Sequence, residues 1–504
     1  MKKYILTTIA GLALVSCRLD DNISPNNPEL DQVSARQRLA AAETTTYSVQ
    51  ASSMNGLGNI FMNSWAGNIY YFGNPLTKET NLNIDASFYQ SIWNNTYITV
   101  SRLQAIIDSE SSKPLPYHRA IAKILKAHYM QYIVDLYNDI PYSEAFKEQG
   151  NIAPKYDKAQ DVYKALVLEL NDAIALIDNS TPSDANAVGG DEDVIMGGNM
   201  QNWKKFANTV KLRYLVRQSK TTDADAKNFV NQQLQTMANA SFVDFDVTIN
   251  PGYNASTAAN QNPLYNAFGR RKSDNTINTY GWRLYKASDH IAKALNGDAT
   301  GVVDPRGKYL FRPVGGRIEG VVQGSLKDAT KEEGNFSFIG GKFYLSASEG
   351  SAMDGYLMLQ AESEFLQADA ALEYPSYFSN AKAHFENGIV ASFAFHGIAG
   401  DAADYINAVD SKPGVGWTAT ADKTEAIQYQ RWIALTNYNG LETYLNYLKT
   451  GYPATPLAVN AQRANKPYRL VYPATEYTSN AVNAPKMTSE DAFVKNQFTP
   501  FWLK

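Results

Sequence analysis

The sequence is poor in cysteine and histidine, and it lacks the common catalytic motifs. Its 504 residues include one cysteine, Cys17, so no disulfide can form within the chain and no Cys-ligated zinc site is possible. The five histidines show no metal-ligand spacing. A Gly-rich phosphate loop, an HExxH motif, a nucleophile elbow and a dinucleotide fingerprint are all absent from the sequence. We therefore predict no enzymatic activity, no metal site and no cofactor.

Charged residues are also scarce, at 19% of the chain. The net charge is -4, and it is more negative still without Lys2 and Lys3, which argues against nucleic acid as a partner. Aromatic residues are plentiful instead, with 32 Tyr and 7 Trp. Their rings combine an apolar face with a polar edge and suit contact surfaces, although most are expected to pack in the core.

The N-terminus has the pattern of a secretory signal. Lys2 and Lys3 precede an apolar run over residues 5–15. This run is too short to span a bilayer as a helix, which takes roughly 20 residues. Its ending, Leu-Val-Ser-Cys, resembles a bacterial lipoprotein signal, so we predict a signal peptide over residues 1–16 and lipidation of Cys17. An ordinary cleavage site beside a chance cysteine is the alternative.

Residues 17–30 are rich in Pro, Asn and Asp and predict an extended tether. Two acyl chains on Cys17 are enough to hold a soluble domain at a membrane. The acidic pair Asp20 and Asp21 resembles an export tag for display on the cell surface, with a plain soluble linker as the alternative.

Most of the remaining chain predicts helices. Apolar residues recur at three-and-four spacing in segments 121–136, 162–177, 203–214, 357–372 and 441–448. Short breaks between paired segments favour antiparallel, tetratricopeptide-like hairpins, with a helical scaffold over about 86–238 and 354–450. Asp157 and Gln160 have capping-box spacing, which predicts a helix start there. His128 lies on an apolar stripe and is expected to be packed and hydrogen-bonded.

Two regions break this helical pattern. From about 240 to 353, Gly, Asn, Tyr and Arg increase and helical periodicity fades, which predicts an irregular lobe with short strands. The C-terminal segment 451–504 is rich in Pro and predicts ordered coil. Long irregular segments in a compact protein are commonly functional.

Two groups of carboxylates were considered for chemistry. Asp191, Glu192 and Asp193 offer oxygen ligands for calcium but lack the EF-hand pattern, so a solvated loop is favoured. Glu362 and Glu364 are two residues apart on a predicted helix and therefore do not share a face, as a glycosidase pair needs.

Several segments, in order along the chain, resemble the SusD/RagB-like outer-membrane lipoproteins of nutrient-uptake systems. The clearest is DLYNDIPYSEAF at 135–146, where Asn138 replaces the family's usual Gly. The others are WKKFANTVKLRY at 203–214, DPR at 304–306, ESEFLQADAAL at 362–372, QRWIAL at 430–435, TGYP at 450–453 and PFW at 500–502. We expect these segments to be packing elements, with Glu362 and Asp369 paired to basic residues of neighbouring helices.

The resemblance implies one SusD-like domain over residues 31–504, mainly α-helical. It further implies a lipid-anchored outer-membrane protein, facing the cell surface, that partners a TonB-dependent β-barrel transporter of the SusC type. Such a protein captures an oligosaccharide, or in some relatives a peptide, and delivers it without cleaving it. A structural or adhesive surface lipoprotein and, less favoured, a surface hydrolase are the alternatives.

A sugar-binding surface needs aromatic planes beside polar groups. Two segments outside the predicted scaffold combine these, one at 65–74 and one at 270–283. The candidate ligand-binding residues are Trp65, Tyr70, Tyr71, Asn74, Arg270, Tyr280 and Trp282. Buried packing positions for Trp65 and Trp282 are the alternative.

Overall fold

A computed structural model describes residues 34–147 and 150–504 of the chain. The predicted signal peptide, the lipidation site and the whole predicted tether lie outside these residues. The fold is mainly α-helical with tetratricopeptide-like hairpins and a loop-rich lobe that contains short strands, as predicted. No helix in the described residues is both long enough and apolar enough to cross a membrane.

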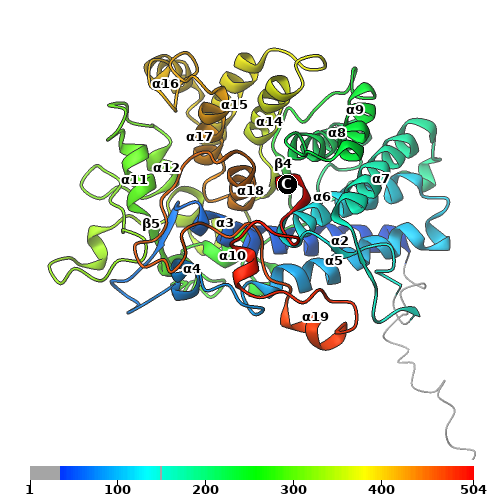
Figure 1. Ribbon diagram of the computed structural model, residues 1–504, viewed down its shortest axis with the longest axis horizontal. Coiled ribbons are helices and arrows are strands. Elements are labelled where there is room, and N and C mark those ends of the chain that lie inside the picture. Colours follow the sequence, from blue (N-terminus) through cyan, green and yellow to red (C-terminus); the bar gives the residue numbers. More distant parts are fainter. Residues whose placement is uncertain (1–33, 148–149) are drawn as a thin grey trace, which may run out of the picture.

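The first helical group is built from consecutive helices that pack on one another. Its members are α2 (Ala35–Val49), α3 (Asn55–Phe61), α5 (Gln90–Asp108), α6 (Pro116–Tyr137), α7 (Ala159–Asn179), α8 (Met200–Arg217) and α9 (Ala224–Gln235). α5, α6, α7 and α8 each contact the next helix in the chain, and α2 lies against α5 and α6. In Figure 1 most of these helices occupy the right-hand side of the molecule, and α3 lies near its centre.

A second helical group lies across the top of Figure 1. It consists of α14 (Gln360–Glu373), α15 (Ala381–Phe395), α16 (Ala402–Val409), α17 (Lys423–Leu435) and α18 (Gly440–Thr450). α14 packs on α8 and α18 packs on α3, so the two groups are in direct contact. Residues of α17 and α18 join the main core, whereas α14, α15 and α16 pack largely around a second cluster of buried residues. Gly58 and Gly440 meet where α3 crosses α18, and a Cβ on Gly58 would lie only 1.9 Å from the backbone of Gly440.

The loop-rich lobe lies at the left of Figure 1 and holds short elements. They are α4 (Thr77–Asn81), α10 (Pro263–Phe268), α11 (Asp289–Asn296), α12 (Gly307–Leu310) and α13 (Ala347–Ser351). Three antiparallel pairs form the sheets, namely β1 (Trp65–Gly67) with β5 (Tyr285–Ala287), β2 (Ile140–Pro141) with β3 (Tyr156–Asp157), and β4 (Val247–Ile249) with β6 (Gly355–Met358). The C-terminal coil carries α19 (Ala474–Ser479).

One local prediction needs correction, and another is confirmed. The helix α7 begins after Lys158, which makes no side-chain cap, so the predicted Asp157–Gln160 capping box does not form. The Asp157 carboxylate instead accepts hydrogen bonds from the backbone N–H groups of Tyr142 and Ser143, at 2.9 and 2.7 Å, and thereby fixes the turn after β2. His128 is buried and hydrogen-bonded as predicted, with Nδ1 3.1 Å from Nη2 of Arg213.

Candidate functional site

The two segments predicted to bind ligand lie side by side because β1 pairs with β5. Trp65 lies opposite Ala287, and Gly67 lies opposite Tyr285. This register places the loop that follows β1 beside the loop that precedes β5. The backbone N–H of Asn68 donates to the carbonyl of Leu284 at 2.8 Å and extends the contact. Segments more than 200 residues apart in sequence therefore form one surface.

Five aromatic rings gather on this surface. Tyr71 and Phe72 meet edge to face at 4.9 Å, and the Phe72 ring lies 6.0 Å from that of Tyr280. Tyr70 stacks on Phe336 with ring centroids 4.5 Å apart and planes 23° apart. Tyr280 is 79% exposed and Tyr71 is 47% exposed. We call these five residues the aromatic surface.

The carboxylate of Glu333 holds the side chains of Arg283 and Asn68 at the aromatic surface. Arg283 donates from Nε and Nη2 to the two oxygens of Glu333, at 2.9 and 2.7 Å, and its guanidinium lies 3.6 Å from the ring centroid of Tyr71. Asn68 also donates to Glu333, at 2.7 Å. Partial burial raises the pKa of Glu333, but these hydrogen bonds outweigh burial and lower the pKa below its usual value. Glu333 therefore holds its charge and fixes Arg283 under the ring.

Lys286 fixes the second edge of the surface from below. Its side chain is fully buried, and Nζ donates to the backbone carbonyls of Glu333 and Phe336, at 2.9 and 3.1 Å. Burial lowers the pKa of Lys286 to about 7. Lys286 thus holds both ends of the turn at residues 333–336, and this turn keeps the Phe336 ring against Tyr70.

Trp65 and Trp282 take the buried packing positions that were the alternative to ligand binding. Trp65 is fully buried, packs edge-on against Phe268 at 4.8 Å, and donates from Nε1 to Oδ1 of Asn437 at 2.6 Å. Trp282 is 5% exposed, stacks on Phe338 at 4.1 Å, and donates from Nε1 to the carbonyl of Ile339 at 2.9 Å. Both indoles find apolar neighbours and a hydrogen-bond acceptor in the core, so they support the surface from behind.

The other predicted residues divide between the surface and its surroundings. The structure brings Tyr70, Tyr71 and Tyr280 together. Arg270 instead lies over the ring of Tyr344, with 4.3 Å between guanidinium carbon and ring centroid. Asn74 is exposed on the loop before α4, where its carbonyl accepts a hydrogen bond from Thr77.

Three residues of this site were not singled out from the sequence, namely Lys286, Glu333 and Phe336. Phe336 lies in a Gly- and Phe-rich stretch of the irregular lobe, which is the one sequence signal that could have drawn attention to it. Its stacking partner Tyr70 is far away in the chain, so only the folded structure connects the two rings.

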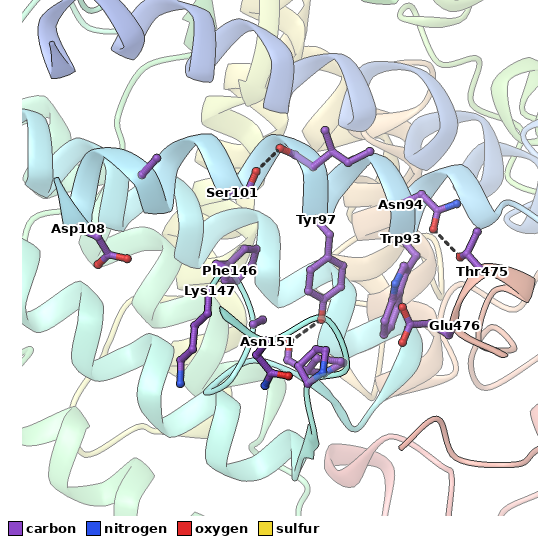
Figure 2. A pocket seen from close by; sticks show the side chains of 15 residues that line it. Trp93, Asn94, Tyr97, Ser101, Asp108, Phe146, Lys147, Asn151, Thr475 and Glu476 are labelled. Carbon is purple, nitrogen blue, oxygen red and sulfur yellow. Dashed lines mark hydrogen bonds between the residues drawn. The ribbon is translucent and has the colours of Figure 1, made fainter. Parts of the chain in front are cut away.

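A cavity of about 870 Å³ lies elsewhere, between α5, the loop after β2, and α19 (Figure 2). Its wall includes the rings of Trp93, Tyr97 and Phe146. It shares no lining residue with the aromatic surface.

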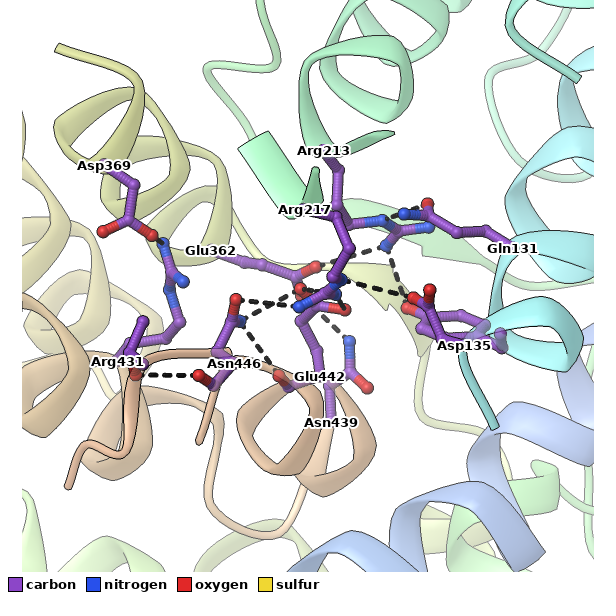
Figure 3. A network of polar contacts seen from close by, with 12 residues as sticks. Gln131, Asp135, Arg213, Arg217, Glu362, Asp369, Arg431, Asn439, Glu442 and Asn446 are labelled. Atoms are coloured by element: carbon purple, nitrogen blue, oxygen red, sulfur yellow. Dashed lines mark hydrogen bonds and ion pairs between the residues drawn. The ribbon is translucent and has the colours of Figure 1, made fainter. Parts of the chain in front are cut away.

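Four carboxylates that were candidate calcium ligands or a candidate glycosidase pair make structural contacts, namely Glu192, Asp193, Glu362 and Glu364. Glu362 belongs to a buried ion network between the two helical groups (Figure 3). Glu364 accepts a hydrogen bond from, or shares a proton with, Nδ1 of His384 at 2.8 Å. Glu192 contacts Arg36, and Asp193 is buried rather than solvated as expected, because it caps the turn before α8.

The buried network joins five helices. Its ion pairs are Arg217–Asp135 at 3.2 Å, Arg217–Glu442 at 2.7 Å, Arg213–Glu362 at 3.6 Å and Arg431–Asp369 at 2.8 Å. The predicted pairing of Glu362 and Asp369 with basic residues of neighbouring helices is thus confirmed. These side chains are at most 5% exposed, so the network is part of the scaffold.

Residues 25–473 match the family described as SusD-like, starch-binding and associating with the outer membrane. The chain belongs to the SusD-like family. None of the curated proteins matches its sequence. Most segments that carry the family resemblance lie in the helical groups, and the two at 304–306 and 500–502 lie outside them but place Arg306 and Trp502 in buried positions. Asn138 ends α6 with φ of 62°, a backbone conformation that suits Gly or Asn.

Solved structures of SusD homologues share this fold. A chitin-binding SusD homologue from Flavobacterium johnsoniae superposes with a TM-score of 0.70 at 21% identity, over 92% of this chain and 98% of its own. A homologue from Bacteroides fragilis superposes with a TM-score of 0.69 at 20% identity, over 94% of this chain and 100% of its own. A homologue from Bacteroides uniformis gives 0.68 at 23% identity, over 93% and 99%. At these identities the likeness establishes the fold.

Proposed function

We propose that this SusD-like protein captures an oligosaccharide at the aromatic surface and delivers it, without cleaving it, to a TonB-dependent outer-membrane transporter. The observation that carries the proposal is the meeting of Tyr71, Tyr280 and Arg283 on one exposed face. The family description and the chitin-binding relative support a carbohydrate ligand.

The chemistry of a sugar fits this face. Pyranose rings have apolar C–H faces that pack on aromatic planes, and hydroxyl groups around the edge that need hydrogen-bond partners. Tyr71 and Tyr280 offer exposed rings, and Tyr70 and Phe336 extend the apolar area. Arg283 lies over the Tyr71 ring, and the exposed Asn74 follows Tyr71 by three residues in the sequence. Both side chains carry hydrogen-bond donors.

Binding of defined ligands to the purified full chain tests this proposal. Chito-oligosaccharides, malto-oligosaccharides and a mixed peptide pool should be titrated separately by calorimetry. Tyr71→Ala and Tyr280→Ala should each weaken glycan binding several-fold, since an exposed aromatic contact contributes about 1 kcal/mol. Tyr377→Ala is the matched control, because Tyr377 is also exposed but lies between α14 and α15.

Two outcomes of that titration would redirect the proposal. Binding of peptides alone would favour the peptide-binding alternative within the same uptake system. Normal glycan binding by both tyrosine variants would remove the aromatic surface as the site. Product analysis after long incubation separates capture from hydrolysis, and intact oligosaccharide is expected.

We also propose that Cys17 carries the lipid anchor, from the lipoprotein-like signal before it. Cys17→Ala should abolish incorporation of radiolabelled palmitate and release the protein from the outer-membrane fraction. Gentle detergent extraction of the wild type should recover a large β-barrel partner. Recovery of this chain alone, under conditions that preserve other outer-membrane complexes, would favour the structural or adhesive alternative.

A further inference from the structure

The cavity beside α5 has the features of a second ligand site. It lies between α5, residues 141–147 and 151–154, and the start of α19, and its volume is about 870 Å³ (Figure 2). Small-molecule sites commonly measure about 300–1,000 Å³ and combine apolar walls with a few polar groups. Its walls come from three distant parts of the chain, and it is separate from the aromatic surface.

Three aromatic rings form one wall in a fixed arrangement. Trp93 and Tyr97 have ring centroids 4.9 Å apart, and Tyr97 stacks on Phe146 at 5.6 Å with planes 26° apart. The Tyr97 hydroxyl donates to the carbonyl of Pro141 at 2.6 Å, which locks its ring orientation. The wall is therefore preorganised.

Phe146 occupies this wall in an unfavourable backbone conformation. Its φ is 63°, in the left-handed region that bulky residues rarely adopt. Such conformations cluster at ligand-contacting positions, where the surrounding structure enforces them. Here the cost is met in a loop that places the Phe146 ring against Tyr97 at the cavity.

Polar groups with unused hydrogen-bonding capacity border the rings. Trp93 lines the cavity, and its indole N–H makes no hydrogen bond among the described residues, so this donor is free for a ligand in the cavity. Asn94 accepts a hydrogen bond from the Thr475 hydroxyl at 2.9 Å, and within the described part of the chain its NH₂ group has no acceptor.

Charged groups at the rim have both signs. Lys147 brings a positive charge, and Asp108 and Glu476 bring negative ones. Glu476 accepts a hydrogen bond from the Tyr156 hydroxyl through Oε2, at 2.7 Å. The cavity thus offers an aromatic wall, N–H donors, and carboxylate acceptors around one space.

We propose that this cavity binds a neutral saccharide and is a second carbohydrate site on the same protein. Apolar C–H faces match the rings of Tyr97 and Phe146, and hydroxyl groups can both accept from Trp93 and Asn94 and donate to Glu476. A second site raises the avidity for a long glycan that reaches both sites. This inference does not depend on the aromatic surface being a binding site.

Fluorine NMR of the full chain labelled with 5-fluorotryptophan tests the proposal. The Trp93 resonance is identified by its loss in Trp93→Phe. Maltose, cellobiose and N,N′-diacetylchitobiose are the probes, and at least one should shift this resonance saturably. Asn94→Ala should weaken that shift about tenfold, by removing hydrogen bonds to the ligand. Lys147→Ala should weaken it to a smaller extent, and its exposed side chain leaves the fold intact.

Tyr280→Ala is the control and should leave the Trp93 titration unchanged, because Tyr280 lies on the aromatic surface. Binding that depends on Tyr280 is measured on the same samples, so failure at one site is distinguished from failure at the other. A Trp93 resonance unmoved by every disaccharide would overturn the proposal. A shift produced only by peptides, or one abolished by Tyr280→Ala alone, would overturn it equally.

Discussion

In the part of the chain that the structure describes, an arginine lies over an aromatic ring and contacts both oxygens of a glutamate at two places. Arg217 contacts Glu442 at 2.7 Å and lies 5.6 Å from the Trp502 ring centroid. Arg283 contacts Glu333 at 2.7 Å and lies 3.6 Å from the Tyr71 ring centroid. The first pair is 1% and 4% exposed, and the second is 30% and 23% exposed.

The difference in burial separates a structural role from the binding role that we propose for the aromatic surface. The Arg217–Glu442 pair (Figure 3) has lost its water, so each charge depends on its protein partners, and the pair links α8 to α18. The Arg283–Glu333 pair keeps contact with water and leaves the Tyr71 ring 47% exposed. It orders a surface that a ligand can reach.

The largest effect that we expect is a loss of stability when one charge of the buried Arg217–Glu442 pair is removed. Glu442→Gln removes the charge that faces Arg217 and leaves a buried guanidinium undercompensated. We expect the free energy of unfolding to fall by about 3–5 kcal/mol, as for other broken buried pairs. Glu386→Gln is the control, since Glu386 forms an exposed pair with Lys382 and should cost about 0.5 kcal/mol or less. Chemical denaturation of both variants measures the contrast, and equal losses would contradict it.

A second contrast concerns an aromatic residue on the aromatic surface and one buried behind it. Trp65→Ala deletes a fully buried indole and should cost about 3–5 kcal/mol. Tyr280→Ala removes a ring that is 79% exposed and should change stability by about 0.5 kcal/mol or less. Thermal melts give both values. A large loss for Tyr280→Ala would place that ring in the core instead of on a ligand-facing surface.

The helical scaffold could be predicted from the sequence because each of its helices buries one stripe of apolar side chains, which recurs at a regular spacing. The predicted stripes at 121–136, 162–177 and 203–214 all fall within helices, namely α6, α7 and α8. Residues 35–61 were not recognised as α2 and α3. Their Ala, Thr, Ser and Gly give a weak apolar stripe, and the helix start is set by a local capping box between Ser34 and Gln37.

The candidate site could be predicted only in part. Gly and Asn around Trp65 indicated a turn, but the indole partner is Asn437, and no local pattern shows a contact across 372 residues. The sequence located both segments of the site, yet not their pairing through β1 and β5. Burial and pairing of these residues depend on long-range packing, which local spacing does not encode.

The exposed pair can be tested through binding. Glu333→Gln weakens the hold on Arg283 and Asn68, so Tyr71 and Phe336 become less well ordered. We expect glycan affinity to fall several-fold, with stability changed by about 1 kcal/mol or less. Calorimetry and thermal melts measure the two effects. Glu319→Gln is the control, since it makes the same charge change at an exposed position outside the aromatic surface, and it should bind normally. A large stability loss without a binding defect in Glu333→Gln would assign this pair to the scaffold.

The smallest expected effect distinguishes two glutamates within the buried network itself. Four carboxylates there face three guanidinium groups, so the network carries one excess negative charge when every carboxylate is ionised. Burial and then the neighbouring Glu442 raise the pKa of Glu362, with Arg213 opposing them. For Glu442, burial also raises the pKa, but Arg217 and Arg213 outweigh it and lower the pKa. Of these two glutamates, Glu362 thus holds a proton more readily.

Glu362→Gln should therefore behave unlike Glu442→Gln. A raised folded-state pKa stabilises the fold fully below the unfolded pKa of about 4.3, and this contribution is lost as pH rises through the folded pKa. Glutamine is always neutral, so the variant should match the wild type near pH 4.5 and exceed it at pH 7.5, by on the order of 1 kcal/mol. Buried histidines such as His290, whose pKa burial lowers to about 4, act in the opposite direction, but they are common to both proteins and cancel in the difference. Thermal melts of the variant and the wild type between pH 4.5 and 7.5 measure this difference in stability. A Glu362→Gln variant that loses stability as pH rises, relative to the wild type, would show that Glu362 is ionised and held by Arg213.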